Sequence, residues 1–256
     1  MNILTYNWKG GCAKSTISSI IASYLDDSKL LEIDFINKSD KKLNTEGYYE
    51  SEQINFVNET SDAFYEFENQ LLDDGVKVID CGAVMLDKLH SALKTSNLYS
   101  NIDLIVLPAM DGADDFNVAY KFLTNIKGLV DPTKIIIAFN RFDPIEYNND
   151  ISEQFETFFN NKKLLKDKFG IDLDDENSYF VIKNSKAIKK SRAMGIVLKS
   201  LIDQDIKEIT DRQRAEKDGA KRLIITKERG LVQNAHNLYS EYISPMLEKI
   251  AIKLEQ

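Results

Sequence analysis

Cysteine is scarce in this sequence, and its scarcity argues against two kinds of protein. The 256 residues include two cysteines, Cys12 and Cys81, which lie far apart along the chain. A disulfide framework or a zinc site needs more thiols at closer spacing. We therefore interpret both cysteines as small loop residues and not as metal ligands or catalytic thiols.

Long apolar runs are missing as well. No run approaches the roughly 20 residues that a helix needs to span a bilayer. The N-terminus also lacks the basic segment and the apolar stretch of a secretory signal. We therefore expect a cytoplasmic protein without a membrane partner. The sequence also has no visible internal repeat, so a repeat architecture is not expected.

An overall positive charge is missing too. The formal net charge is −8, and residues 1–150 hold 13 Lys and Arg against 24 Asp and Glu, whereas residues 151–256 hold 20 against 17. Any surface for nucleic acid must therefore be local. The composition, 43% hydrophobic and 29% charged, is typical of a soluble globular protein.

The densest chemical signal is a loop that contains two adjacent glycines, in residues 7–16. It follows an apolar stretch at residues 3–6 and precedes apolar residues at helical spacing from Ile17 to Leu25. The order is therefore strand, loop and helix, in which backbone N–H groups and the helix N-terminus converge on one point. Such a point suits the phosphates of a nucleotide. Lys14 supplies a positive charge there, and the Ser15 hydroxyl supplies an oxygen ligand for Mg²⁺.

This loop resembles the deviant Walker A motif of the ParA/MinD ATPases, which reads N-x-K-G-G-x-G-K-[ST]-T. The pattern fits except at Ala13, where the family has glycine, and Trp8 stands where a strict P-loop has its first glycine. The resemblance implies an ATP-sandwiched homodimer in which Lys9, the signature lysine, reaches the phosphates bound by the partner subunit. The implied nucleotide-binding residues are Lys9, Gly10, Gly11, Cys12, Ala13, Lys14, Ser15 and Thr16.

Two carboxylates follow apolar strands and are expected near this loop. Asp34 ends the stretch 30–34, and the resemblance implies that it orients the attacking water, although Ile36 replaces the second aspartate of the family motif. A turn-capping role for Asp34 stays open. Asp80 ends the apolar stretch 76–79 and precedes Cys81-Gly82, the pattern of a Walker B strand whose carboxylate holds Mg²⁺. We predict Ser15 and Asp80 as the metal-site residues, and Lys9, Lys14 and Asp34 as the catalytic residues.

Further strands are predicted at 54–57, 103–108, 134–143 and 179–182, with helices at 63–72, 114–127 and 151–170 between them. Asn140 lies at the end of the apolar run in 134–143, and the resemblance implies that its amide binds the adenine edge, which both donates and accepts hydrogen bonds. A turn-capping role is the alternative. Strands that alternate with helices predict an α/β fold with a doubly wound, mostly parallel sheet and helices on both faces, as in P-loop NTPases.

A basic cluster follows the last strand. Residues 183–192 contain five basic side chains and no acidic one, which favours contact with DNA phosphates without sequence readout. A solvated helix face is an equally good interpretation. The predicted DNA-binding residues are Lys186, Lys189, Lys190 and Arg192.

The C-terminal part is predicted to be helical. We expect residues 1–200 to form the P-loop ATPase domain and residues 201–256 a helical extension packed on it. The final helix, near residues 231–254, is expected to kink at Pro245. Its acidic residues among the lysines argue against a membrane-binding amphipathic helix.

Together these features predict a ParA-like, Mg²⁺-dependent ATPase that serves plasmid or other DNA segregation. It would bind DNA non-specifically, lie at the nucleoid and act with a ParB-like, DNA-binding adaptor. Two alternatives stay open. One is a nucleotide-gated scaffold with negligible turnover, suggested by Ala13 and Ile36, and the other is a MinD-like membrane-positioning ATPase.

Overall fold

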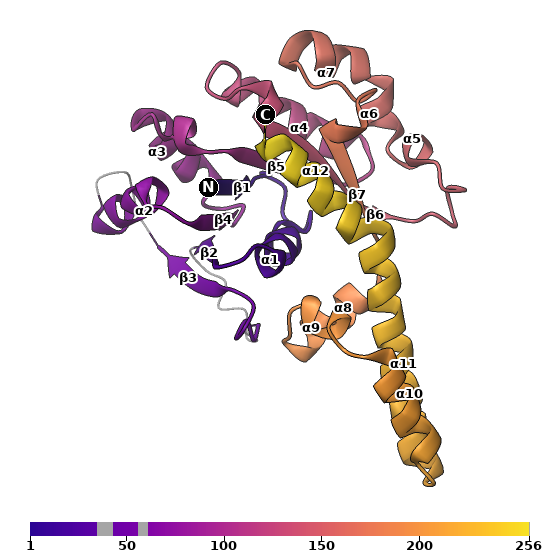
Figure 1. Cartoon of the computed structure of the whole chain (residues 1–256). Coiled ribbons are helices and arrows are strands. Elements are labelled where there is room, and N and C mark those ends of the chain that lie inside the picture. Colours follow the sequence, from indigo (N-terminus) through magenta and orange to yellow (C-terminus); the bar gives the residue numbers. More distant parts are fainter. Residues whose placement is uncertain (35–42, 56–60, 256) are drawn as a thin grey trace.

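The fold is built on a seven-stranded sheet with β1 at its centre (Figure 1). The computed structural model describes residues 1–34, 43–55 and 61–255. Every strand pair is parallel, in the order β3-β2-β4-β1-β5-β6-β7. Helices cover both faces, so the predicted doubly wound α/β sheet is confirmed. The strands are β1 (Asn2–Thr5), β2 (Ser28–Ile33), β3 (Glu50–Ile54), β4 (Val76–Cys81), β5 (Leu104–Ala109), β6 (Ile135–Phe142) and β7 (Tyr179–Lys183).

The helices fall into two layers. On one face α2 (Asp62–Leu72), α3 (Leu86–Thr95), α4 (Ala113–Ile126), α5 (Ile151–Gln154), α6 (Glu156–Asn160) and α7 (Lys162–Phe169) pack in one core. The other face carries α1 (Lys14–Tyr24), α8 (Lys186–Met194), α9 (Lys199–Ile202), α10 (Ile206–Ala215), α11 (Gly219–Leu238) and α12 (Ser244–Leu254). Short 3₁₀ turns lie at Leu98–Asn101, Pro132–Lys134 and Glu176–Ser178.

The central strands divide their side chains between these two layers. Leu4 and Ile79 enter the core with α2, α3 and α4, whereas Ile3 and Val78 enter the core with α1. Because successive strand residues point to opposite faces, a continuous apolar run is the pattern of a strand buried on both sides. The short β1 is buried at all four positions, which fixes the start of the glycine loop at the middle of the sheet.

Three local predictions differ from the structure. The third strand runs over Glu50–Ile54 and not over 54–57, part of which lies outside the described residues. Helix α3 was not predicted, although Leu86, Leu89 and Leu93 are buried at helical spacing. The predicted helix 151–170 is divided into α5, α6 and α7, because the backbone leaves the helical conformation at Phe155 and Asn161.

The C-terminal helices form a projection and an anchor. Figure 1 shows α10 and the first half of α11 extending from the body as a helical hairpin, while α12 lies along the sheet beside β7. A π-helical turn at Tyr239–Ile243 joins α11 to α12, in which Pro245 is the second residue. Proline lacks a backbone N–H and its ring crowds the preceding turn of the helix. A wider, π-helical turn relieves this crowding at the place where the sequence predicted a kink. Across the described residues, no helix combines the length and the apolarity that crossing a membrane requires.

Candidate functional site

The glycine loop is held against the sheet by Asn7. The buried Asn7 amide donates to the Pro108 carbonyl of β5, and its Oδ1 accepts a hydrogen bond from the Lys9 N–H at 2.7 Å. Gly11 has a φ of 76°, and Ala13, which precedes α1, has a φ of 71°. The loop thus uses the left-handed region twice. Glycine adopts this region without cost, whereas alanine does so under strain.

Lys14 begins α1 and folds back over the loop. Its buried Nζ donates to the carbonyls of Asn7 at 2.8 Å and Lys9 at 3.0 Å. These carbonyls hold the ammonium in the hollow of the loop. The loop N–H groups and the start of α1 surround the same hollow, so positive charge and backbone donors converge there.

Asp80 lies at the end of β4, between β1 and β2. Strand register pairs it with Thr5 on one side and Glu32 on the other. Asp80 is 8% exposed, and within the described ranges its Oδ1 has no hydrogen-bond partner. Burial raises the pKa of Asp80 to about 6, against the opposing effects of the Ser15 hydroxyl and the Lys14 charge. A buried carboxylate oxygen without a partner beside Ser15 is a donor set that suits Mg²⁺, which prefers few protein oxygens and keeps several waters.

Asp34 follows β2 and lies against the loop after β4. A Cβ built on Gly82 would lie 2.6 Å from Asp34 Cγ, and Gly82 N–H donates to the Ile33 carbonyl at 2.8 Å. Any side chain at position 82 would collide with the Asp34 carboxylate, so glycine is required there. Glycine at position 82 therefore brings this carboxylate beside Asp80 at one edge of the sheet. Ile36, the other residue of this motif, lies outside the described residues.

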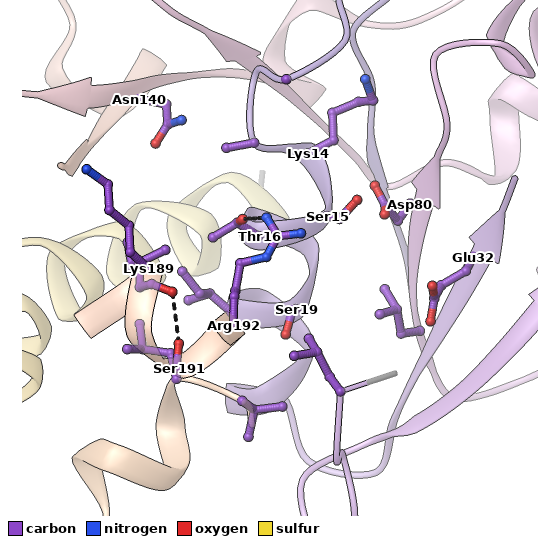
Figure 2. Close-up of a pocket in the computed structure, with 18 of the residues that line it drawn as sticks. Lys14, Ser15, Thr16, Ser19, Glu32, Asp80, Asn140, Lys189, Ser191 and Arg192 are labelled. Carbon is purple, nitrogen blue, oxygen red and sulfur yellow. Dashed lines mark hydrogen bonds between the residues drawn. The ribbon is translucent and has the colours of Figure 1, made fainter. Parts of the chain in front are cut away.

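One pocket of about 760 Å³ unites these residues. Gly10, Gly11, Ala13, Lys14, Ser15, Thr16, Asp34, Asp80 and Asn140 all line it, and they come from the ends of four strands and the start of α1. The 6%-exposed Asn140 ends up across the pocket from Asp80, as Figure 2 shows. The volume is in the range of sites for small molecules. The predicted residues Lys9, Cys12, Lys186 and Lys190 do not line it.

The sequence reasoning missed three charged lining residues, namely Glu32, Arg141 and Lys183. Glu32 lies two residues before Asp34 on the same strand face, a spacing that could have indicated it. Arg141 has a φ of 62° in a bulge of β6, and its Nη2 donates to the Gly11 carbonyl at 3.3 Å. No local pattern predicts such a bulge.

The basic helix α8 is divided by the pocket. Lys189 and Arg192 line it, and Arg192 Nη1 donates to Thr16 Oγ1 at 2.7 Å (Figure 2). Lys186 and Lys190 are exposed outside it. Ser185 caps the helix and also bonds Asn234 of α11 at 2.9 Å, so that α8 is fixed between the pocket and α11.

Lys9 points away from the pocket in this single chain. Its Nζ donates to Asp115 Oδ2 near the start of α4, and this bond raises the pKa of Lys9. The Asp115 side chain is 1% exposed and also accepts a hydrogen bond from Met110 N–H at 3.2 Å. Lys9 therefore has a defined partner within its own chain.

The two cysteines are free and buried, and burial raises the pKa of both thiols. Cys12 donates to the Lys9 carbonyl at 3.2 Å. High pKa and burial make them poor nucleophiles. Cys12 lies in the glycine loop as expected, but the interpretation of Cys81 as a loop residue was wrong, because the pairing of β4 with β2 continues to Cys81.

Comparison with known proteins finds likeness at the level of fold. No family model and no curated protein sequence matches the chain. Among solved structures, a putative plasmid partition protein from Borrelia burgdorferi B31 bound to AMPPNP matches with a TM-score of 0.51 and 13% identity, over 78% of this chain and 94% of that one. Another structure of a plasmid partition protein from Borrelia burgdorferi matches with a TM-score of 0.47 and 15% identity, over 78% of this chain and 96% of that one. Apo McdA of Cyanothece matches with a TM-score of 0.45 and 11% identity, over 91% of this chain and 98% of that one. Of these three, the first alone exceeds 0.5, and at its low identity it shows a shared fold and nothing further.

Proposed function

We propose that this chain is a ParA-like ATPase that binds ATP with Mg²⁺, dimerises around the nucleotide and serves DNA segregation. The observation that carries the proposal is the convergence of Lys14, Ser15 and the unpartnered Asp80 oxygen on one pocket that Asn140 also lines. A phosphate-binding loop, a metal-type oxygen pair and an amide in the same pocket for the base are the parts that an ATP site needs. The AMPPNP bound to the Borrelia protein of the same fold supports this choice of ligand.

Within this proposal each side chain has a separate task. Ser15 and Asp80 would hold the metal ion, which when bound offsets negative charge on the phosphates. Lys14 leaves the loop carbonyls for phosphate oxygens, exchanging a neutral acceptor for a charged one. Asp34 accepts a hydrogen bond from the attacking water and orients it, and Asn140 holds the base.

Dimerisation would engage Lys9. In the free chain Lys9 is paired with Asp115, so reaching the phosphates of a partner subunit requires that this ion pair open. The proposed partners are a second copy of the chain, non-specific DNA at the exposed basic residues of α8, and a ParB-like adaptor. The nucleoid would be the site of action.

Sedimentation velocity with no nucleotide, ADP or ATP–Mg²⁺ tests the proposal. We expect a monomer that becomes a dimer with ATP–Mg²⁺ alone. Lys14→Ala should abolish nucleotide binding, whereas Lys9→Ala should retain binding as a monomer and lose the dimer. Lys94→Ala on the exposed face of α3 is the matched control. Full nucleotide affinity in Lys14→Ala would refute the phosphate-loop assignment.

One observation favours a second candidate, the nucleotide-gated scaffold with negligible turnover. Ala13 holds a left-handed conformation, so the loop carries a Cβ at the position where the family has glycine. Phosphate release measured with DNA and adaptor present separates the two functions, because a scaffold would dimerise without releasing phosphate. No comparable observation favours the membrane-positioning alternative, since Met246 and Ile250 of α12 are buried against the sheet.

A further inference from the structure

Helix α8 presents two different faces to its surroundings. Ser185 and the α8 residues Ile188, Lys189, Ser191 and Arg192 line the pocket. They are related by spacings of three and four residues, so they lie in one stripe on one side of the helix. Lys186 and Lys190 are exposed and lie off this stripe. The basic cluster of the sequence is therefore two sets of charges with different surroundings.

The acidic and the basic side chains of the pocket lie on opposite sides of it. Glu32, Asp34 and Asp80 lie at the ends of β2 and β4, whereas Arg141, Lys183, Lys189 and Arg192 lie at the ends of β6 and β7 and on α8. Neither Lys189 nor Arg192 forms an ion pair with a carboxylate anywhere in the part of the chain that the structure describes. An anion bound along Lys14 and Asn140 would meet these cations directly.

Arg192 is the best placed of them. Its single hydrogen bond to a side chain in the described ranges goes to the neutral Thr16 hydroxyl, one residue beyond Ser15 on the first turn of α1. A guanidinium has five N–H donors, so several remain for a ligand. Figure 2 shows Arg192 reaching over this turn, while Lys189 extends toward Asn140.

We propose that Arg192 and Lys189 bind the nucleotide itself, Arg192 through the phosphates near Thr16 and Lys189 near the nucleoside end. The inference rests on the proposed function, because it assigns two further residues to the same ATP pocket. Lys14 reaches the terminal phosphates in loops of this kind, whereas Arg192 lies beyond Ser15 along α1 and serves the phosphates that ADP and ATP share. The four basic residues of α8 then divide into two that hold nucleotide and two, Lys186 and Lys190, that are free to meet DNA.

The test measures the affinity of the full chain for ADP–Mg²⁺ and for AMPPNP–Mg²⁺. Isothermal titration calorimetry gives these affinities, and the fluorescence of Trp8, the one tryptophan of the chain, gives an independent readout. We expect Arg192→Ala to weaken both nucleotides about tenfold, the size of one charge-assisted hydrogen bond. Lys189→Ala should have a smaller effect in the same direction. Arg192→Lys, which keeps the charge, should recover part of the affinity.

Lys186→Ala and Lys190→Ala are matched controls, since they remove the same charge from the same helix off the pocket stripe. We expect both to bind nucleotide within twofold of the wild type. Equal affinities in Arg192→Ala and Lys186→Ala, with wild-type binding intact, would overturn the inference and leave the ATP site standing. A wild-type chain that binds neither nucleotide would instead refute the proposed function. Circular dichroism confirms that each variant is folded.

Discussion

At the scale of single residues, Ala13 is the point where sequence and backbone conflict. It precedes α1 with a φ of 71° and a ψ of 23°. An L-residue in this region carries a strain of roughly 1–2 kcal/mol, which glycine does not have. Replacing Ala13 with glycine would remove this strain, but glycine also makes the unfolded chain more flexible, which offsets part of the gain in stability.

We therefore expect Ala13→Gly to raise the free energy of unfolding by about 1 kcal/mol, measured by urea denaturation. Ala251→Gly is the control, because Ala251 is exposed within α12. There the same substitution should lower the free energy of unfolding by about 0.5–1 kcal/mol. Equal losses at both positions would contradict the left-handed geometry of Ala13.

Asp80 gives a pH dependence with a definite sign. Burial raises the pKa of its carboxyl in the folded state to about 6, from 3.8. Between these values the folded state binds more protons than the unfolded state, so the Asp80 contribution to stability falls as the pH rises. The loss is complete only well above pH 6, where the buried carboxyl is fully ionised.

In the nucleotide-free protein, Asp80→Asn removes this titration. The variant should gain stability relative to the wild type by up to about 3 kcal/mol as the pH rises from 4 to 7. Urea denaturation of both proteins at several pH values measures the difference. A difference that is independent of pH would mean that burial does not raise the pKa of Asp80 in the folded state.

At the scale of elements, α8 connects the pocket to the second half of α11. Its Ser185 and the Ala187 N–H both bond Asn234 of α11, at 2.9 and 3.0 Å. Its outer lysines, Lys186 and Lys190, are exposed on the same element whose inner stripe lines the pocket. A change in pocket occupancy thus has a short physical route to the surface that would meet DNA.

The double variant Lys186→Ala/Lys190→Ala should weaken binding to non-specific duplex DNA. Each lost phosphate contact reduces the slope of log K against log salt by about 0.9, so the slope should fall by about 2. Lys94→Ala/Lys163→Ala, which removes two exposed lysines from α3 and α7, is the charge-matched control. Binding measured by fluorescence anisotropy at four salt concentrations gives both slopes, and equal slopes would exclude a DNA-binding role for α8.

At the scale of the whole molecule, the pocket draws residues from both halves of the chain. Thr16 and Arg192 are separated by 176 positions in sequence, and Gly11 and Arg141 by 130. A ligand that joins such parts binds only the folded state, and it stabilises that state by RT ln(1 + [L]/Kd).

We expect ATP–Mg²⁺ at 100 times its Kd to add about 2.7 kcal/mol, which for a chain of this size raises the Tm by roughly 5–10 °C. Lys14→Ala should show no such rise. Differential scanning calorimetry across a series of nucleotide concentrations measures the shift. A rise of equal size in Lys14→Ala would show that nucleotide binds elsewhere on the molecule.

The sequence by itself determined the sheet strands and the glycine loop, because both depend on local patterns. Continuous apolar runs predicted six of the seven strands near their observed positions, and the order of strand, loop and helix predicted the position of Lys14 and Ser15. Local patterns failed where the backbone conformation depends on its surroundings. The two breaks that separate α5, α6 and α7, the π-turn before Pro245 and the bulge at Arg141 are of this kind.

Only the tertiary structure decided which charges face the pocket. The sequence presented Lys186, Lys189, Lys190 and Arg192 as one basic cluster, since spacing along the chain does not tell which side of a helix meets the sheet. Packing of α8 between the pocket and α11 divides them. The pairing of Lys9 with Asp115, 106 positions away, is likewise decided by β1 and β5 being neighbours in the sheet. Contacts between distant segments follow from strand order, which no local pattern records.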